Sequence, residues 1–425
     1  SHPYQPIVIL VSLDGFREEY LSRGLTPNLH ALASSGVSAS YMTPAFPSLT
    51  FPNHYSIVTG LHPESHGIVG NIFLDPILND TFVYVNSTKA SDAKWWGGEP
   101  LWVTTIKAGL KSATCMWPGS EAPIHNTFPT YYQRYNGSMP NPERITLVLS
   151  WLALPPEQRP SFLTLYISEV DTLGHKYGPD SPVVNGAIAN ADHLVGELVR
   201  GVLAVRNASS LQESGVNVVV VSDHGMAPGN EIDKFYFLDD YWPSDRFDVI
   251  NNVVVSIYPK DSVDTVALYN ALYAASQKTG HWQVWLRDQV PAAFHYSHNT
   301  RIGPIVALPD EGYGLTTHAD YDARIANKPY KLGGMHGYNN SLEDMRAVFV
   351  AAGAASSTMT SPALSNATAT HAWSSSFASD LQLLPGFNNV EVYNLLLHVL
   401  KISAVAAPNN GTEAGMTLFK PWLMY

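Results

Sequence analysis

Acidic and histidine side chains recur where short apolar runs of this chain end. Asp14 closes the run PIVILVSLDG, and Asp171 follows SFLTLYISEV. A third run, VNVVVV, is followed by Asp223 and His224. One carboxylate after a strand commonly caps the next turn. Three such positions, two of them accompanied by histidine, instead favour one shared site of imidazole and carboxylate donors. Without thiolates, this donor set is typical of catalytic zinc.

Two more histidines enlarge this donor set. His175 lies four residues after Asp171, so one helical turn would present both on the same face. His336 lies among glycines in GGMHGYNN, where the backbone can approach a bound group closely. Three aspartates and three histidines are enough for two ions, given one more oxygen donor. Two ions about 4 Å apart stabilise the attacking and leaving oxygens of a displacement at phosphorus.

Thr50 is the candidate for the additional oxygen donor. It lies between Pro47 and Pro52 in FPSLTFPNHY, a stretch without helical or strand periodicity. Coordination to a divalent cation lowers the pKa of a threonine hydroxyl and makes it a nucleophile. The structural alternative is that Phe-Pro pairs form a rigid turn and that threonine caps a helix.

The elements that must position these residues predict an α/β fold. Continuous Val, Ile and Leu runs are typical of strands buried on both faces of a largely parallel sheet. Residues 26–36 and 186–205 have helical patterns between these runs, and residues 345–353 predict a later strand. In open α/β sheets the ligands gather beyond the carboxyl ends of the strands. We expect one domain over residues 1–425, with an inserted irregular and β-containing subregion around 225–330.

The composition limits the classes of partner that we expect this chain to bind. The chain has 425 residues and a formal charge of -12, and it contains no Lys/Arg cluster of the kind that grips a phosphate backbone. We therefore expect no stable nucleic-acid binding, while small phosphorylated substrates stay possible. No apolar run is long enough to span a membrane. The chain starts at Ser1 without Met, so a signal or anchor segment could have been removed.

Cysteine and sequon usage bear on the compartment. Cys115 is the only cysteine, which excludes an internal disulfide framework and predicts a small buried side chain. The density of N-x-S/T triplets favours a secreted or lumenal, N-glycosylated protein. These triplets begin at Asn79, Asn86, Asn136, Asn207, Asn339, Asn366 and Asn410.

Taken together, these motifs resemble a known family. FPSLTFPNHYSIVTGLHPESHGIVGN resembles the nucleophile segment of the nucleotide pyrophosphatase/phosphodiesterases, in the alkaline phosphatase superfamily. VSLDGFR, VDTLGHKYGP, VVSDHGM and GMHGYNN resemble the other metal motifs of that family, in the same order. The similarity spans nearly the whole chain and corresponds to the catalytic domain alone. It implies an alkaline-phosphatase-like three-layer sandwich, with helices on both faces of a mostly parallel central sheet.

The resemblance also implies roles for individual residues. Thr50 would be the nucleophile and form a covalent phosphothreonine-type intermediate, and the Asn71 amide would donate to a phosphoryl oxygen. Two zinc ions would be bound. The ligands of one would be Asp171, His175 and His336, and those of the other Asp14, Thr50, Asp223 and His224.

Three positions match the nucleobase site of nucleotide-hydrolysing members. Phe51 and Tyr135 would stack on the base, and Lys89 would lie near it. Phe51 could instead be an apolar plug beside the turn, and Tyr135 could be a structural residue of its loop. The chain departs from the family pattern at Val170, where proline is common, and at Asn339, where aspartate is usual. Neither change removes a ligand.

These features predict a zinc-dependent hydrolase of nucleotide phosphodiester and pyrophosphate bonds. Its substrates would include ATP, cleaved to AMP and pyrophosphate, together with dinucleotides and nucleotide sugars. Some relatives hydrolyse phospholipid or choline-phosphate esters with the same metal site, which is the alternative. A non-enzymatic binding protein is disfavoured, because degenerate relatives usually lose a ligand or the nucleophile.

Overall fold

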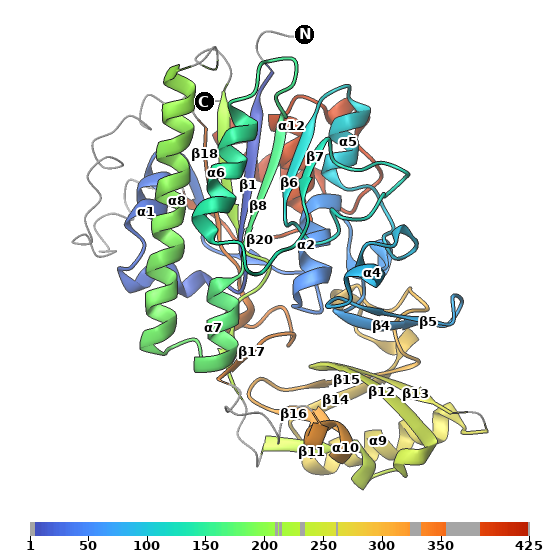
Figure 1. Cartoon of the computed structure of the whole chain (residues 1–425). Helices are drawn as coiled ribbons and strands as arrows, with labels where there is room; N and C mark the ends of the chain where they lie inside the picture. Colours follow the sequence, from blue (N-terminus) through green and yellow to red (C-terminus); the bar gives the residue numbers. More distant parts are fainter. Residues whose placement is uncertain are drawn as a thin grey trace.

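The computed structural model describes residues 5–208, 211, 215–229, 234–260, 262–323, 333–353 and 383–423. The sequon at Asn366 lies outside these ranges. The centre of the molecule is an eight-stranded sheet (Figure 1). Its strands are β1 (Ile7–Leu13), β2 (Val37–Ala39), β6 (Ser112–Cys115), β7 (Tyr131–Gln133), β8 (Phe162–Ile167), β9 (Val216–Val221), β18 (Phe349–Gly353) and β19 (Leu383–Leu384).

The strand order is β19-β2-β18-β9-β1-β8-β6-β7. All neighbours from β9 to β7 pair in parallel, and β18 pairs antiparallel to both β9 and β2. Strand β1 lies at the centre and is buried along its whole length. The sequence shows this directly, because an unbroken apolar run has no face for solvent.

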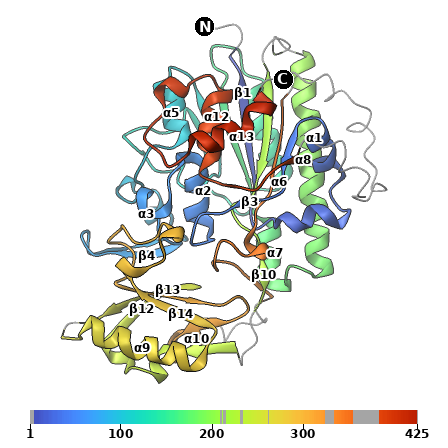
Figure 2. The same cartoon turned by 180° about the vertical axis from the view of Figure 1, so that it is seen from behind.

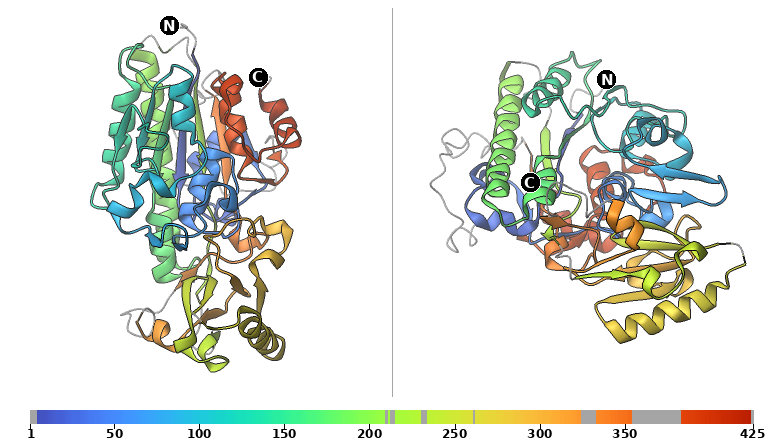
Figure 3. Two further views of the ribbon diagram at one scale, coloured as in Figure 1. Left: turned by 90° about the vertical axis from the view of Figure 1, so that its right-hand side faces the viewer. Right: turned by 60° about the horizontal axis from the view of Figure 1, so that its bottom comes forward.

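Helices cover both faces of the sheet, as the views from behind and from the side show (Figures 2 and 3). Alternate residues of β1 enter two separate apolar cores, with Ile9 in one and Leu10 in the other. The Ile9 core includes side chains of α1 (Pro27–Ser34), α6 (Asn141–Leu152) and α8 (Pro182–Ala208). The Leu10 core includes side chains of α2 (Thr50–Thr59), α5 (Leu101–Lys107), α12 (Glu391–Val399) and α13 (Glu413–Leu423). The predicted three-layer α/β fold is confirmed.

A smaller unit is inserted between β10 (Ala227–Pro228) and β17 (Gly334–Met335), which pair antiparallel. It occupies the lower part of Figure 1. Its elements are β11 (Phe235–Phe237), β12 (Phe247–Asn252), β13 (Val254–Pro259), α9 (Thr265–Thr279), β14 (Trp282–Leu286), β15 (Ile305–Pro309), β16 (Gly314–Thr316) and α10 (His318–Tyr321). Strands β12, β13, β15 and β14 form an antiparallel sheet with its own apolar core, to which α9 contributes Leu268 and Leu272. The region is thus more regular than its aromatic, pattern-poor sequence suggests.

The inserted unit is fastened to the main unit by polar contacts. Arg301 Nε donates to Asp75 Oδ2 at 2.7 Å, and Glu64 Oε2 accepts from the Ser297 N–H at 2.7 Å. The Tyr296 hydroxyl donates to the Val69 carbonyl at 2.7 Å. Asp75 and Glu64 belong to the short elements β4 (Ile72–Asp75) and α3 (Pro63–His66). Strand β4 pairs antiparallel with β5 (Asp80–Val83), which is followed in the chain by α4 (Ser87–Ala90).

The remaining strands and α-helix of the described residues are β3 (Met42–Thr43), β20 (Phe387–Asn388) and α7 (Glu169–Tyr177), and short 3₁₀ helices lie between the elements. None of the described helices combines the length and apolar character needed to cross a bilayer. Of the described sequon asparagines, Asn339 is half-buried and the others are exposed. Occupancy of these sequons stays a prediction.

The half-buried Glu311 carboxyl of the inserted unit lies beside Asp344 of the main unit. Burial and the charge of Asp344 raise the pKa of Glu311 from 4.5 to about 7. The folded state therefore favours the protonated carboxyl. Its stabilising effect is complete below pH 4.5 and is lost as the pH rises through about 7.

Replacing Glu311 by Gln should remove this pH dependence, because the amide stays neutral beside Asp344. We expect Glu311→Gln to match the wild type in thermal midpoint near pH 4.5 and to exceed it at pH 8. Thermal melts across this range check the prediction. The exposed Glu157→Gln control should leave the wild-type pH dependence unchanged. A steep wild-type profile retained in Glu311→Gln would contradict the assignment.

Candidate metal centre

The fold brings the predicted ligands to one edge of the central sheet. Asp14 directly follows β1, and Asp223 and His224 follow β9, both at the carboxyl ends of parallel strands. Asp171 and His175 lie one turn apart on α7, which follows β8. Asp171 is therefore in the first turn of α7 and shares a helical turn with His175, as the four-residue spacing predicts. The apolar run before it is strand only as far as Ile167, where β8 ends and the chain turns into α7.

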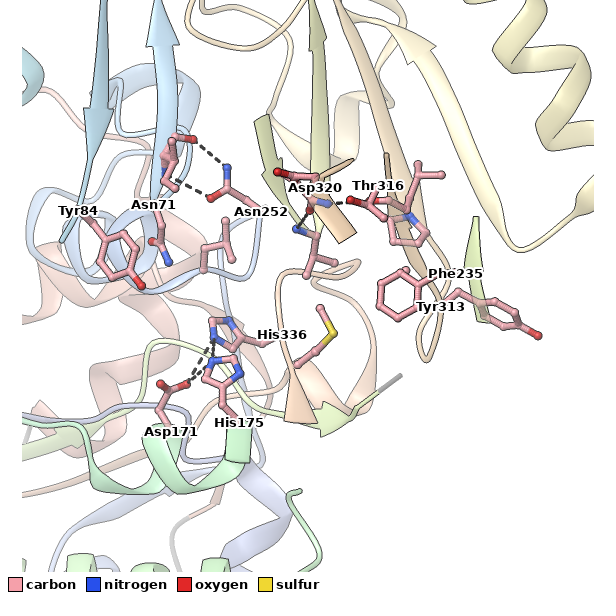
Figure 4. Close-up of a pocket in the computed structure, with 18 of the residues that line it drawn as sticks. Asn71, Tyr84, Asp171, His175, Phe235, Asn252, Tyr313, Thr316, Asp320 and His336 are labelled. Carbon is pink, nitrogen blue, oxygen red and sulfur yellow. Dashed lines mark hydrogen bonds and ion pairs between the residues drawn. The ribbon is translucent and has the colours of Figure 1, made fainter. Parts of the chain in front are cut away.

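Asp171, His175 and His336 form one group of potential ligand atoms (Figure 4). Asp171 Oδ1 is 3.4 Å from His336 Nε2 and 3.5 Å from His175 Nε2. The two Nε2 atoms are 3.0 Å apart. His336 comes from the loop after β17, so the chain beyond the inserted unit completes this group.

His224 is the centre of the second group. Its Nε2 is 2.9 Å from Asp223 Oδ2, 3.5 Å from Asp14 Oδ1 and 3.3 Å from Thr50 Oγ1. The His224 ring also stacks on His336, with ring centroids 3.6 Å apart. The two groups are therefore contiguous. His224 has ligand atoms within reach of both, so its assignment to one ion stays a prediction.

The three histidines share one hydrogen-bonding arrangement. The Nδ1 atoms of His175, His224 and His336 lie 2.8–2.9 Å from the carbonyl oxygens of Gly334, Gly225 and Ser48, respectively. A carbonyl accepts only, so each Nδ1 carries a proton, and each Nε2, when it is unprotonated, presents its lone pair to the cluster. This is the tautomer that a metal-binding histidine needs.

The three aspartates of the cluster each have a buried carboxylate oxygen that accepts no hydrogen bond from the described part of the chain. Asp14 Oδ1, Asp171 Oδ1 and Asp223 Oδ2 are buried and have no hydrogen-bond partner among the described residues. Burial and the charges of Asp223 and Asp171 raise the pKa of Asp14 well above its ordinary value. Burial opposes ionisation of Asp223 too, but His224 and His54 outweigh it and hold the pKa of Asp223 well below its ordinary value. Because buried charge is costly without a counter-charge, this arrangement suits cations.

Neighbouring side chains hold the ligands in place. The buried Tyr166 hydroxyl donates to Asp14 Oδ2, which leaves Oδ1 of that carboxylate facing His224. The His54 ring bridges Ser12 Oγ and the Thr50 carbonyl at 2.8 Å each, and its Nδ1 is 3.3 Å from Asp223 Oδ2. Sequence reasoning missed Tyr166, because an unbroken apolar strand gives no sign of which side chain reaches a neighbour.

Thr50 begins helix α2, with Leu49 as its N-cap. The Phe51 N–H donates to Asn71 Oδ1 at 3.0 Å, and Pro52 has no N–H. The Thr50 N–H has no acceptor among the described residues. The start of α2 therefore offers one backbone donor and the positive end of the helix dipole to an anion at Thr50 Oγ1. The capping alternative finds no support, because no side chain caps α2.

Asn71 lies immediately before β4 and faces the histidine cluster (Figure 4). Because Oδ1 accepts from the Phe51 N–H, the amide nitrogen is the free end, and Figure 4 shows it turned toward His336. This orientation suits a donor to an oxygen bound between Thr50 and the histidines. The role itself stays a prediction.

The residues predicted to contact the nucleobase differ in their surroundings. Phe51 packs edge-on against Tyr84, with ring centroids 5.5 Å apart, while Tyr135 is 58% exposed. Lys89 Nζ is engaged by Asp80 and does not line the cavity described below. Tyr84 was missed by sequence reasoning, although it follows Phe82 by two residues and could have been placed on the same face of the hairpin.

A cavity of about 520 Å³ opens from the cluster toward the inserted unit. From the main unit it is lined by Asn71, Tyr84, Asp171, His175 and His336, among others. From the inserted unit it is lined by Phe235, Asn251, Val253, Leu315, Thr316 and Asp320, among others. A volume of this size is typical of small-molecule sites.

Comparisons with known proteins agree with this geometry. The model of the type I phosphodiesterase/nucleotide pyrophosphatase family matches residues 8–339. An uncharacterized pyrophosphatase/phosphodiesterase of Schizosaccharomyces pombe is 38% identical over 98% of this chain and 80% of its own length. Ectonucleotide pyrophosphatase/phosphodiesterase family member 3 of Bos taurus is 37% identical over 97% of this chain. The chain spans 44% of that relative's length.

A solved structure is similar across the whole chain. Murine ectonucleotide pyrophosphatase/phosphodiesterase 5, an inactive variant in complex with AMP, has a TM-score of 0.81 and 32% identity, covering 97% of this chain and 99% of its own. The family match, the identities and this structural agreement together show that the chain belongs to the type I phosphodiesterase/nucleotide pyrophosphatase family.

Proposed function

We propose that this protein hydrolyses nucleotide phosphodiester and pyrophosphate bonds through a covalent threonine intermediate, with two zinc ions. The observation that carries the proposal is the position of Thr50. Its hydroxyl lies at the start of α2, 3.3 Å from His224 Nε2 and beside unsatisfied buried carboxylate oxygens. The murine relative supports a threonine nucleophile, because its inactive form is a threonine-to-alanine variant.

The donor set fits a pair of zinc ions. The Nε2 lone pairs of His175 and His336 face each other at 3.0 Å, an arrangement that a cation between or beside them would relieve. Asp171 would join these two histidines at one ion, and Asp14, Thr50, Asp223 and His224 would hold the other. When bound, the ions would supply Lewis acidity at the phosphoryl oxygens and lower the pKa of the Thr50 hydroxyl.

The residues of the chain would divide the chemistry as follows. Thr50 Oγ1 attacks phosphorus and gives up its proton to water, the bond from phosphorus to the leaving oxygen breaks, and the leaving group departs with that electron pair. The Asn71 amide and the Thr50 N–H donate to the phosphoryl oxygen on which charge accumulates. One such donor is worth about 3 kcal/mol. Water then displaces Thr50 from phosphorus, which releases the nucleoside monophosphate and restores the hydroxyl.

The nucleoside would lie on the side of Phe51, Tyr84 and Tyr135. Aromatic faces accept any base, so we expect loose selectivity among nucleotides. The AMP bound by the murine relative supports a nucleotide ligand. Because family members include venom phosphodiesterases and ectonucleotide enzymes, we also propose a secreted or lumenal location with N-glycosylation.

Thr50→Ala should lower kcat by at least about 10⁴-fold, because the nucleophile is lost. Zinc content should persist through the remaining ligands. Turnover of a nucleoside 5'-p-nitrophenyl ester and metal analysis by mass spectrometry measure the two effects. Thr146→Ala, an exposed threonine on α6, should behave as the wild type. Undiminished turnover in Thr50→Ala would refute the nucleophile assignment.

Substrate preference gives a separate test. The aromatic side chains around Thr50 predict a higher kcat/KM for the nucleoside 5'-p-nitrophenyl ester than for p-nitrophenylphosphorylcholine. Steady-state kinetics on both esters with the same preparation measure the ratio. A preference for the choline ester would replace the nucleotide assignment with the choline-phosphate diesterase alternative.

Tyr166→Phe should weaken zinc binding by about 10- to 100-fold, because Asp14 loses the donor that fixes its orientation. Zinc titration against a fluorescent chelator measures this without any turnover. Tyr55→Phe is the matched control, since the Tyr55 hydroxyl is equally buried and has no hydrogen-bond partner among the described residues. Equal zinc affinity in Tyr166→Phe and the wild type would show that the contact does not position Asp14.

A further inference from the structure

The turn between β12 and β13 is a part of the inserted unit that lines the cavity beside the candidate metal centre. Val253 in this turn has φ of 76°, which is a strained conformation for a β-branched residue. Asn251 holds the turn in place: its Oδ1 accepts from the Val253 N–H at 3.1 Å, and its Nδ2 donates to the Leu315 carbonyl at 2.9 Å. Strain of this kind persists where the surroundings fix the backbone, and it often marks functional sites.

Asn252 connects this turn to the main unit by two hydrogen bonds. Its Oδ1 accepts from the Ile72 N–H at 3.2 Å, and its Nδ2 donates to the Ile72 carbonyl at 2.8 Å, as Figure 4 shows. Both polar atoms of the Asn252 side chain therefore form hydrogen bonds, and both bonds are made to the main chain of Ile72. Ile72 directly follows Asn71.

The same turn packs against the backbone beside His336. A Cβ atom on Gly337 would lie 2.9 Å from the Asn252 carbonyl oxygen and 3.0 Å from Val253 Cβ and Leu49 Cδ2. Leu49 directly precedes Thr50. The turn thus lies against the residue next to the candidate ligand His336 and is bonded to the residue next to Asn71, and Leu49 packs beside the same glycine.

A short chain of contacts runs from Asn252 to the reacting group. Asn252 fixes the main chain of Ile72, which fixes the origin of the Asn71 side chain. Asn71 Oδ1 accepts from the Phe51 N–H, which leaves the amide nitrogen facing the histidines. A hydrogen-bond donor stabilises a transition state only when it lies within a few tenths of an ångström of the required position. Because Asn252 holds the main chain of Ile72, it also determines how accurately the Asn71 amide is placed.

We propose that Asn252 is a positioning residue for Asn71, so that the inserted unit takes part in phosphoryl transfer through this amide. The inference rests on the proposed function, because Asn71 has a phosphoryl oxygen to serve only in that reaction. It assigns to the inserted unit a contribution to the rate of the chemical step, in addition to lining the cavity.

A double-mutant cycle tests the proposal. On the nucleoside 5'-p-nitrophenyl ester, Asn71→Ala should lower kcat by about 10²- to 10³-fold. Asn252→Ala should lower kcat about 10-fold with KM within about twofold, because the lost interaction is made in the transition state. The double variant should be no slower than Asn71→Ala alone. Losses that multiply, or a loss confined to KM, would overturn the proposal.

Two further variants guard against a general folding defect. Asn270→Ala removes an exposed amide from α9 of the same inserted unit and should retain wild-type kcat. Asn252→Asp keeps the acceptor for the Ile72 N–H but turns a carboxylate oxygen toward the Ile72 carbonyl, so its kcat should fall at least as far as that of Asn252→Ala. A lowered thermal midpoint in both Asn252 variants with an unchanged kcat would indicate a structural role only.

A crystal structure of Asn252→Ala separates failure of this inference from failure of the proposed function. The Asn71 amide should be displaced, with its hydrogen bond to the Phe51 N–H lengthened or lost. An unmoved Asn71 would overturn the positioning role whatever the activity of the protein. If the wild type failed to cleave the ester, the proposed function would fall, and the crystal structure would still decide whether Asn252 positions Asn71.

Discussion

Buried negative charge without an equal amount of positive charge is the constraint around which this molecule is built. Asp14 and Asp223 place carboxylate oxygens within 3.5 Å of His224 Nε2, and Asp171 places one 3.4 Å from His336 Nε2. No arginine or lysine side chain pairs with these carboxylates among the described residues. The histidine Nε2 atoms add lone pairs to the same volume. In an apolar interior such an arrangement is strongly unfavourable by itself, and divalent cations are the natural counter-charge.

The surrounding architecture explains how such a cluster can form from distant parts of the chain. Strands β1 and β9 run in parallel and end at one edge, and α7 returns from β8 to the same edge. The main-chain carbonyls of Gly334, Gly225 and Ser48 then orient the three rings. Backbone geometry thus sets the tautomer, and the rigid sheet sets the positions. The result is a preorganised site, in which little rearrangement is needed when charge develops on a substrate.

The sequence predicted an α/β fold with a largely parallel sheet and the identities of the candidate ligands, because both leave local signals; the three-layer arrangement was implied by the family resemblance. Continuous apolar runs reveal strands buried on both faces, and polar residues at their ends reveal the functional edge. What depends on tertiary contact left no such signal. Asn252 meets Ile72 across 180 residues of sequence, and the Tyr166 hydroxyl reaches Asp14 from within an apolar strand. The contact between Tyr84 and Phe51 likewise depends on how the β4–β5 hairpin packs beside α2.

The inserted unit leaves the main unit at Pro228 and rejoins it at Gly334, two residues that face each other in the β10–β17 pair. Insertion is well tolerated where chain ends lie this close, because the host backbone is not disturbed. A different unit joined at these two positions would therefore leave the sheet that carries the ligands unaltered. It would still have to supply partners for the Ile72 peptide groups, and for Asp75, Glu64 and the Val69 carbonyl.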